Sequence, residues 1–230
     1  MSMKKLLTAN AGSGRRRTLH VFRDFCEISA IAIRNAVDAS GYSDRESRYL
    51  SIITNYSTDE INRFAATLAE LTMAIESDFS DVLGHLYMCM EFGNEALGQV
   101  FTPYSLSRVM AKIVIDDIDD HLEQQGFITV NDLACGSGGM FIAVADSLQE
   151  QGINYQKALH VTAQDIDITA VHMTYIQLSL LHVPAVVIHG DTLAQTQLDI
   201  WPTPAHVIDR WSDKLRQQSK PQKKIFEDAS

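Results

Sequence analysis

Cysteine and long apolar runs are scarce in this sequence, and each scarcity excludes a class of protein. The three cysteines among 230 residues are odd in number and far apart, at Cys26, Cys89 and Cys135. They support neither a disulfide framework nor a zinc site, and no metal is predicted. No apolar run approaches the roughly 20 residues that cross a bilayer, and the N-terminal residues lack a signal-peptide core. We expect a cytoplasmic protein that does not use a membrane.

Basic residues are also few, with 19 Lys and Arg against 29 Asp and Glu, which gives a formal net charge of -10. Most of them lie near the two ends of the sequence. Residues 1–17 contain five and no acid, and residues 210–230 contain six with three acids. We expect a flexible basic arm over 1–17 and a polar basic tail over 210–230. Since the acidic remainder repels phosphate, DNA is a possible partner only through these ends or through another subunit.

Residues 18–97 are predicted to form a helical domain. Apolar residues recur at intervals of three and four along "TLHVFRDFCEISAIAIRNAV", which is the pattern of an amphipathic helix. Ser57 stands three residues before Glu60, the spacing of a capping box at a helix N-terminus. Gly93 is expected to end the last of these helices.

Residues 98–209 follow a different pattern, in which apolar strands alternate with helices. "FITVNDL", "ALHVTAQ" and "AVVIHGD" are short and rich in β-branched residues, and a helical segment follows each of the first two. Such alternation is typical of a parallel sheet. The predicted fold class is therefore α/β, with an amino-terminal helical domain and a shortened Rossmann-like sheet of at least three parallel strands. Its first strand is expected to be an open edge.

The segment "DLACGSGG", residues 132–139, connects the first strand to a helix through small residues. Backbone N–H groups at a helix start favour an anion, either phosphate or carboxylate. Gly136 and Gly138 fit the dinucleotide pattern G-x-G-x-x-G, but Phe141 occupies the third glycine position, which disfavours a pyrophosphate. The loop can alternatively be only a tight turn. Cys135 within it is either a stabilised thiolate or a small residue that fits a crowded turn.

Acidic residues follow the second and third strands. A carboxylate at the end of the second strand commonly accepts hydrogen bonds from ribose hydroxyls, and Asp165 comes first there. Asp167 can instead cap the next helix. Asp191, after the third strand, can accept from an adenine amino group, or can serve as a cap or turn residue. Because the carboxyl ends of parallel strands share one edge, these loops together predict a nucleoside pocket.

Four segments, "GQVFTP", "DLACGSGGM", "AQDID" and "HGDTL", resemble in order and spacing the N6-adenine DNA methylase family, of the modification-subunit type found in type I restriction systems. The resemblance covers about residues 83–193. It implies a class I methyltransferase sheet and S-adenosylmethionine as cofactor, with the first segment at the methionine end, the second around the amino acid part, the third at the ribose and the fourth at the adenine. The implied cofactor-binding residues are Thr102, Pro103, Asp132, Ala134, Cys135, Gly136, Ser137, Gly138, Gly139, Asp165 and Asp191. Pro103 can also simply open the helix that follows it.

The sequence departs from this family where the catalytic residues should be. Family members carry an Asn-Pro-Pro-aromatic motif, whose Asn accepts from the target amino group and whose ring stacks on a flipped base. Residues 192–230 contain no such motif. "DIWPTP" is the nearest approach, with Asp199 as the acceptor and Trp201 as the ring, or with loop and cap chemistry as the alternative. No catalytic residue is assigned.

The leading interpretation is an S-adenosylmethionine-binding, DNA adenine-N6 methyltransferase-like protein of a bacterial restriction-modification system. The alternatives are a non-catalytic regulatory or interaction subunit that pairs with a full-length methylase or restriction protein, and an unrelated nucleotide-binding module. A partner or a second copy is expected to cover the open first strand. His85 and His121 are expected to lack acidic or cysteine companions at ligand spacing, and His172 and His182 to be surface or core positions, so histidine adds no metal site.

Overall fold

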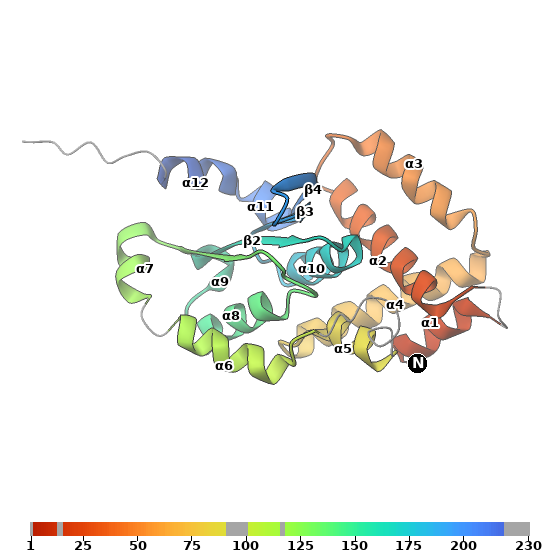
Figure 1. Ribbon diagram of the computed structural model, residues 1–230, viewed down its shortest axis with the longest axis horizontal. Coiled ribbons are helices and arrows are strands. Elements are labelled where there is room, and N and C mark those ends of the chain that lie inside the picture. The colour runs from red at the N-terminus through yellow and green to blue at the C-terminus, as the bar shows by residue number, and fades with distance from the viewer. Residues whose placement is uncertain (1, 13–15, 91–100, 116–117, 219–230) are drawn as a thin grey trace, which may run out of the picture.

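The computed structural model describes residues 2–12, 16–90, 101–115 and 118–218 (Figure 1). The predicted helix end at Gly93 lies outside them. Helices make up the described amino-terminal part of the chain. They are α1 (Met3–Ala11), α2 (Thr18–Asn35), α3 (Tyr42–Ile53), α4 (Thr58–Ser77) and α5 (Val82–Cys89).

The later part of the chain contains the sheet. Its helices are α6 (Tyr104–Val114), α7 (Asp119–Gln125), α8 (Gly139–Glu150), α9 (Tyr155–Ala158), α10 (Ile168–Leu180), α11 (Pro204–Ile208) and α12 (Trp211–Gln218). Its strands are β1 (Ile128–Asp132), β2 (Leu159–Asp165), β3 (Ala185–Asp191) and β4 (Thr196–Pro202). The strand order is β1-β2-β3-β4, and the first three strands are parallel. The α/β prediction and the three predicted strands are confirmed.

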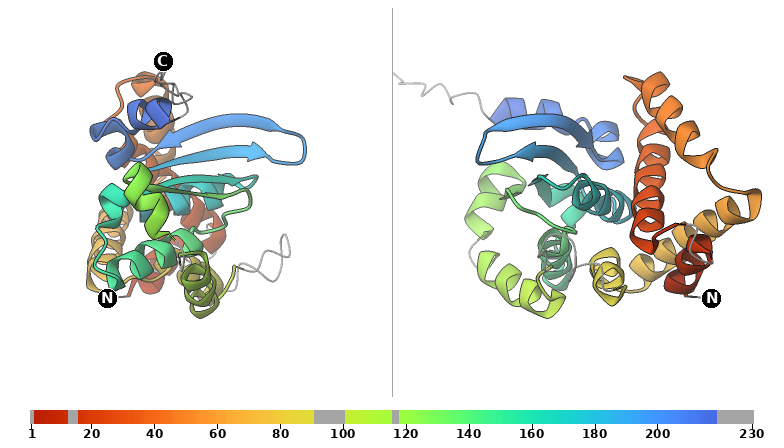
Figure 2. Two further views of the ribbon diagram at one scale, coloured as in Figure 1. Left: turned by 90° about the vertical axis from the view of Figure 1, so that its left-hand side faces the viewer. Right: turned by 45° about the vertical axis from the view of Figure 1, so that its right-hand side comes forward.

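Strand β4 was not predicted. It pairs with β3 in the antiparallel direction and forms a hairpin that projects from the body of the protein (Figure 2). Its first five residues are exposed and only Trp201 is buried. Leu198 and Ile200 alternate with Gln197 and Asp199 but are exposed, so the alternation is short and marks no buried face.

The sheet is covered on both faces. In Figure 1, α8 and α10 lie on one side of the strands, and α11 and α12 lie on the other. Leu159, Val161 and Ala163 of β2 are fully buried. On the opposite side, His160 of the same strand contacts His206 of α11, with Nε2 to Nδ1 at 2.9 Å. Alternating residues of β2 therefore serve two cores, as expected for a strand inside a layered α/β fold.

The helical part packs against α10 through α2. The predicted capping box is confirmed at the start of α4, where the Ser57 hydroxyl accepts from the Glu60 N–H and the Glu60 carboxylate accepts from the Ser57 N–H. Glu60 also pairs with Arg16 at 2.8 Å. This pair places Arg16 on the helical domain, within the segment predicted to be a flexible arm.

The two ends of the chain are more ordered than their charge suggested. The mobile arm predicted over residues 1–17 is wrong for α1, which packs on α4 and buries Leu6 and Leu7. That leucine pair gives the helix an apolar face strong enough to dock despite its lysines. In the predicted tail, α12 begins with the fully buried Trp211, and residues 219–230 lie outside the described part.

The open edge predicted for β1 is confirmed within the described residues, where β1 pairs only with β2.

Helix α6 lies beside α8, with its charged side turned toward α8 and most of its apolar side turned to solvent. Its charged residues face α8, where Arg108 and Lys112 form ion pairs with Glu150. Ala111 is buried, but the larger aliphatic residues of α6 are exposed; they are Leu106, Val109, Met110, Ile113 and Val114. None of the helices described is both long and apolar enough to cross a membrane.

Candidate functional site

The glycine loop lies at the carboxyl end of β1 and leads directly into α8. Gly136 and Gly138 have φ angles of 57° and 87°, a left-handed conformation that residues with side chains rarely adopt. A Cβ atom on Gly136 would come within 2.9 Å of the Phe101 ring. Asp132 fixes the start of the loop, because its carboxylate accepts from the Ala134 N–H at 3.0 Å. The loop therefore has a defined conformation that favours glycine at two positions, Gly136 and Gly138.

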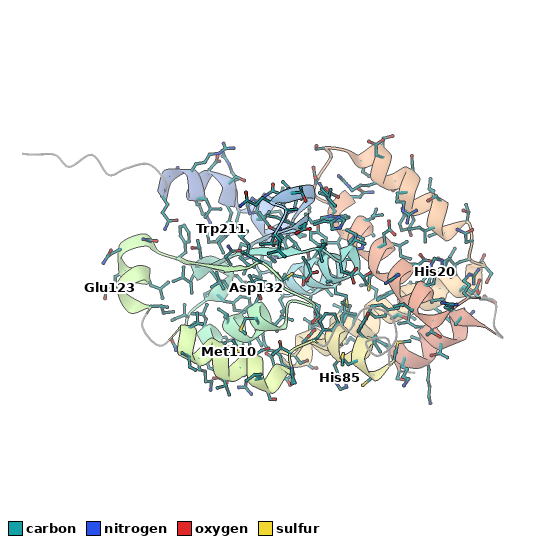
Figure 3. All side chains as sticks on the ribbon, viewed as in Figure 1. His20, His85, Met110, Glu123, Asp132 and Trp211 are labelled. Atoms are coloured by element: carbon teal, nitrogen blue, oxygen red, sulfur yellow. The ribbon has the colours of Figure 1, made fainter. Side chains whose placement is uncertain are left out.

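A cavity of about 110 Å³ lies against this loop. Seven of the predicted binding residues line it: Thr102, Asp132, Ala134, Cys135, Gly136, Ser137 and Gly139. Pro103 lines a neighbouring cavity of about 300 Å³, which shares Thr102 with the first. Figure 3 labels Asp132 near the middle of the molecule, where it ends β1. The structure thus brings the "FTP" segment and the glycine loop together, as the resemblance implied.

The chemistry of this cavity suits the amino acid part of S-adenosylmethionine. Its described lining includes two carboxylates, Asp81 and Asp132, and no lysine or arginine. Carboxylates favour the cationic sulfonium and ammonium groups, and N–H groups at the start of α8 favour the carboxylate of the cofactor. Pockets for a whole drug-sized ligand measure roughly 300–1,000 Å³. The 110 Å³ cavity against the glycine loop can therefore hold only one end of such a cofactor.

Asp165 lies at the carboxyl end of β2 and is 9% exposed. Its carboxylate accepts from the Gly136 N–H and from the Asp167 N–H, each at 2.9 Å. Burial raises the pKa of this carboxyl, while these two hydrogen bonds act in the opposite direction. Asp165 is not among the described residues that line the two cavities, and its contact with the ribose stays a prediction. The alternative given for Asp167 is what the structure shows, because its side chain caps α10 through the Thr169 N–H.

Asp191 ends β3 and makes local contacts. One of its carboxylate oxygens accepts from the Leu193 N–H at 2.8 Å and from the Ala194 N–H at 3.0 Å. These are the contacts of a turn residue, the alternative that the sequence left open. The adjacent Thr192 hydroxyl donates to the Leu133 carbonyl at 2.9 Å, so the hairpin turn and the glycine loop are joined. The adenine contact of Asp191 stays a prediction.

Two other candidates for chemistry are buried. Burial raises the pKa of the Cys135 thiol to about 12, which favours the packing interpretation of this residue over the thiolate. Trp201 is 4% exposed, and its ring packs edge-on against His172 and Tyr175. A buried ring cannot stack on a flipped base. Asp199 lies 3.6 Å from Arg34 in an ion pair, so the "DIWPTP" segment serves packing at this place.

Sequence reasoning missed four residues that line the 110 Å³ cavity, namely Asp81, Phe101, Ser107 and Met140. It was also wrong about His85, whose Nε2 lies 3.2 Å from the Cys89 sulfur one helical turn away. Within the described residues, no group of three or more His, Cys, Asp or Glu could hold a metal ion. The i and i+4 spacing of His85 and Cys89 was the signal that could have revealed their contact.

A family model and a known protein match this chain in sequence. The family model for N-6 DNA methylases matches residues 78–229. The type I restriction enzyme MjaIX methylase subunit of Methanocaldococcus jannaschii is 30% identical over 123 residues, which are 51% of this chain and 20% of that protein. The chain thus matches about a fifth of the length of this relative. A solved structure from Listeria monocytogenes, provisionally described as a class I S-adenosylmethionine-dependent methyltransferase, aligns with a TM-score of 0.49 and 13% identity over 86% of this chain and 55% of the other.

Proposed function

Because the chain belongs to the N-6 DNA methylase family, we propose that it binds S-adenosylmethionine and is a DNA adenine-N6 methyltransferase-like protein of the restriction-modification type. One observation carries the proposal: the glycine loop, Thr102 and Asp132 surround one acidic cavity. Asp165 lies next to this loop, bonded to the Gly136 N–H. The relative in Methanocaldococcus jannaschii is a methylase subunit, which supports DNA as the substrate class.

Each part of the proposed site has a separate task. The N–H groups at the start of α8 would bind the carboxylate of the cofactor, and Asp132 would attract its cationic groups. Asp165 would accept from the ribose hydroxyls. S-adenosylmethionine supplies an activated methyl group, and transfer is an in-line displacement that depends on positioning and needs no metal. The 230 residues do not contain the acceptor motif for the target amino group.

A second candidate function is a non-catalytic interaction subunit, favoured by the exposed apolar face of α6 and the open edge of β1. Transfer of a labelled methyl group to unmethylated DNA by the purified chain would support the enzyme. Cofactor binding without transfer, together with a copurifying methylase or restriction protein, would support the interaction subunit. DNA would then be contacted by that partner or by the basic ends, because the chain as a whole is acidic.

Replacing Asp165 with alanine is expected to weaken S-adenosylmethionine binding at least tenfold. Each charge-assisted hydrogen bond to ribose is worth about 1.5–3 kcal/mol, and the Gly136 N–H also loses its acceptor. The measurement is a calorimetric titration of both proteins under conditions where both are folded. Asp167→Ala serves as the control, because that side chain caps α10 and should leave the affinity within about twofold. An unchanged affinity in the Asp165 variant would place the ribose elsewhere.

A further inference from the structure

A carboxylate from the helical domain lies buried beneath the glycine loop. Asp81 precedes α5 and is 6% exposed, Ser137 belongs to the loop and is 3% exposed, and Gln177 of α10 is fully buried. These residues are separated by 40 to 96 positions in the sequence. The structure therefore joins three distant segments in one polar cluster, which we name the Asp81 cluster.

Every side-chain polar atom of the Asp81 cluster has a hydrogen-bond partner. One carboxylate oxygen of Asp81 accepts from the Gly84 N–H and from the Gln177 amide, each at 2.9 Å. The other accepts from the Ser137 hydroxyl. The Gln177 amide also donates to the Ser137 carbonyl at 2.8 Å, and its oxygen accepts from the Leu83 N–H at 3.0 Å. Both the side chain and the backbone of Ser137 are thus held.

Two glycines make this approach possible. A Cβ atom on Gly84 would overlap the Asp81 carboxylate and the Ser137 hydroxyl, and one on Gly139 would come within 3.1 Å of the same carboxylate. The first glycine belongs to the helical domain and the second to the start of α8. Since a buried charge is costly without its hydrogen bonds, Ser137 cannot leave this position without leaving Asp81 unsatisfied. The cluster therefore fixes the conformation of the loop.

We propose that Asp81 is a positioning residue of the cofactor site, through which the helical domain holds the glycine loop in the conformation that binds S-adenosylmethionine. This inference rests on the proposed function. Asp81 acts through Ser137 and Gln177, and cofactor binding is coupled to the start of α5 in return. By linkage, a ligand that stabilises the loop also stabilises the contacts that hold it.

The test compares two substitutions at one position by calorimetric titration with S-adenosylmethionine. Asp81→Ala removes all three acceptor contacts and is expected to weaken binding about tenfold or more. Asp81→Asn is expected to stay within about threefold of the unmodified protein, because its oxygen still accepts from Gly84 and Gln177 and its amide can donate to the Ser137 oxygen. Equal binding by Asp81→Ala would overturn the proposal. Equal loss in both variants would also overturn it, because it would assign the effect to the charge.

Asp24 provides the matched control. It is an equally buried aspartate of the helical domain, 8% exposed, and accepts from the Tyr56 hydroxyl at 2.5 Å, away from the loop. Asp24→Ala is expected to lower thermal stability while leaving the dissociation constant within about twofold. If the unmodified protein binds no S-adenosylmethionine, the proposed function itself fails, a result that is distinct from equal binding by the variants.

Hydrogen exchange tests the same coupling without any variant. Addition of S-adenosylmethionine to the full chain is expected to slow exchange of the Leu83 and Gly84 amides, because both donate to the Asp81 cluster. The amide of Ser47 should be unaffected, because α3 lies away from α5 and α8 in Figures 1 and 2. Slowed exchange in the loop with no change at Leu83 and Gly84 would contradict the proposal.

Discussion

Replacing Gly138 with valine is expected to weaken S-adenosylmethionine binding at least a hundredfold, which corresponds to about 3 kcal/mol. Gly138 has a φ angle of 87°, and a Cβ atom there would lie 3.0 Å from the Thr174 hydroxyl and 3.1 Å from its methyl group. A β-branched residue is a strong outlier at positive φ, and α10 leaves no room for the added methyl groups. The loop must therefore move away from α10, and its backbone N–H groups then no longer point into the cavity.

Gly152 offers a control for this substitution at the other end of α8. Its φ angle is 77°, and nothing lies within 4 Å of the position a Cβ atom would take. Gly152→Val therefore introduces comparable backbone strain without touching the loop. Calorimetric titration should show an affinity within about twofold of the unmodified protein. If Gly138→Val binds the cofactor as well as this control, the loop does not form the binding site.

Acidification from pH 6.5 to pH 4 is expected to lower the free energy of unfolding by roughly 3 kcal/mol for each of two buried histidines. Burial, together with the neighbouring His206, lowers the pKa of His160 to about 4, and burial lowers the pKa of His172 to about 4. A depressed pKa means that the folded state holds the neutral ring. The contribution is complete above the unfolded pKa of about 6.5 and is lost as the pH falls toward 4. Burial raises the pKa of Asp165, which acts in the opposite direction and offsets part of the loss.

Urea unfolding at pH 7, 5.5 and 4.5 measures this dependence. His172→Phe should reduce the acid slope by about half, because phenylalanine keeps an aromatic ring against Trp201 but takes up no proton. His85→Gln, which replaces an exposed histidine of α5, is the matched control variant. The slope that remains is expected to come from the His160–His206 pair, and a slope that His172→Phe leaves unchanged would contradict the contribution assigned to His172.

Local patterns predicted the elements that bury an apolar face. The three parallel strands, the helices between them and the capping box at Ser57 were found because each repeats a period or spacing of its own. Helix α1 was missed because its lysines hid a short apolar face around Leu7. Strand β4 was missed because hydrogen bonds to β3, rather than burial, hold it in place.

The site was predictable only where it is local. The glycine loop and the segment around Thr102 each carry a short pattern, and the structure places both at one cavity. Asp81 could not be found in this way, because it is 56 residues from Ser137 and its contact depends on how the helical domain docks on α10. For Asp191 the sequence could not separate two roles, because a polar residue at a strand end has the same pattern whether it binds a ligand or forms a turn.

A calorimetric titration of the purified chain with S-adenosylmethionine, S-adenosylhomocysteine and ATP tests the central claim most directly. The proposed site predicts micromolar binding of S-adenosylmethionine, about 8 kcal/mol of binding free energy. Because the Asp132 carboxylate lines the cavity, S-adenosylhomocysteine, which lacks the sulfonium charge, should bind more weakly. ATP should bind weakest, since its phosphates meet acidic residues. Tighter binding of ATP, or no binding of either sulfur compound, would contradict the account.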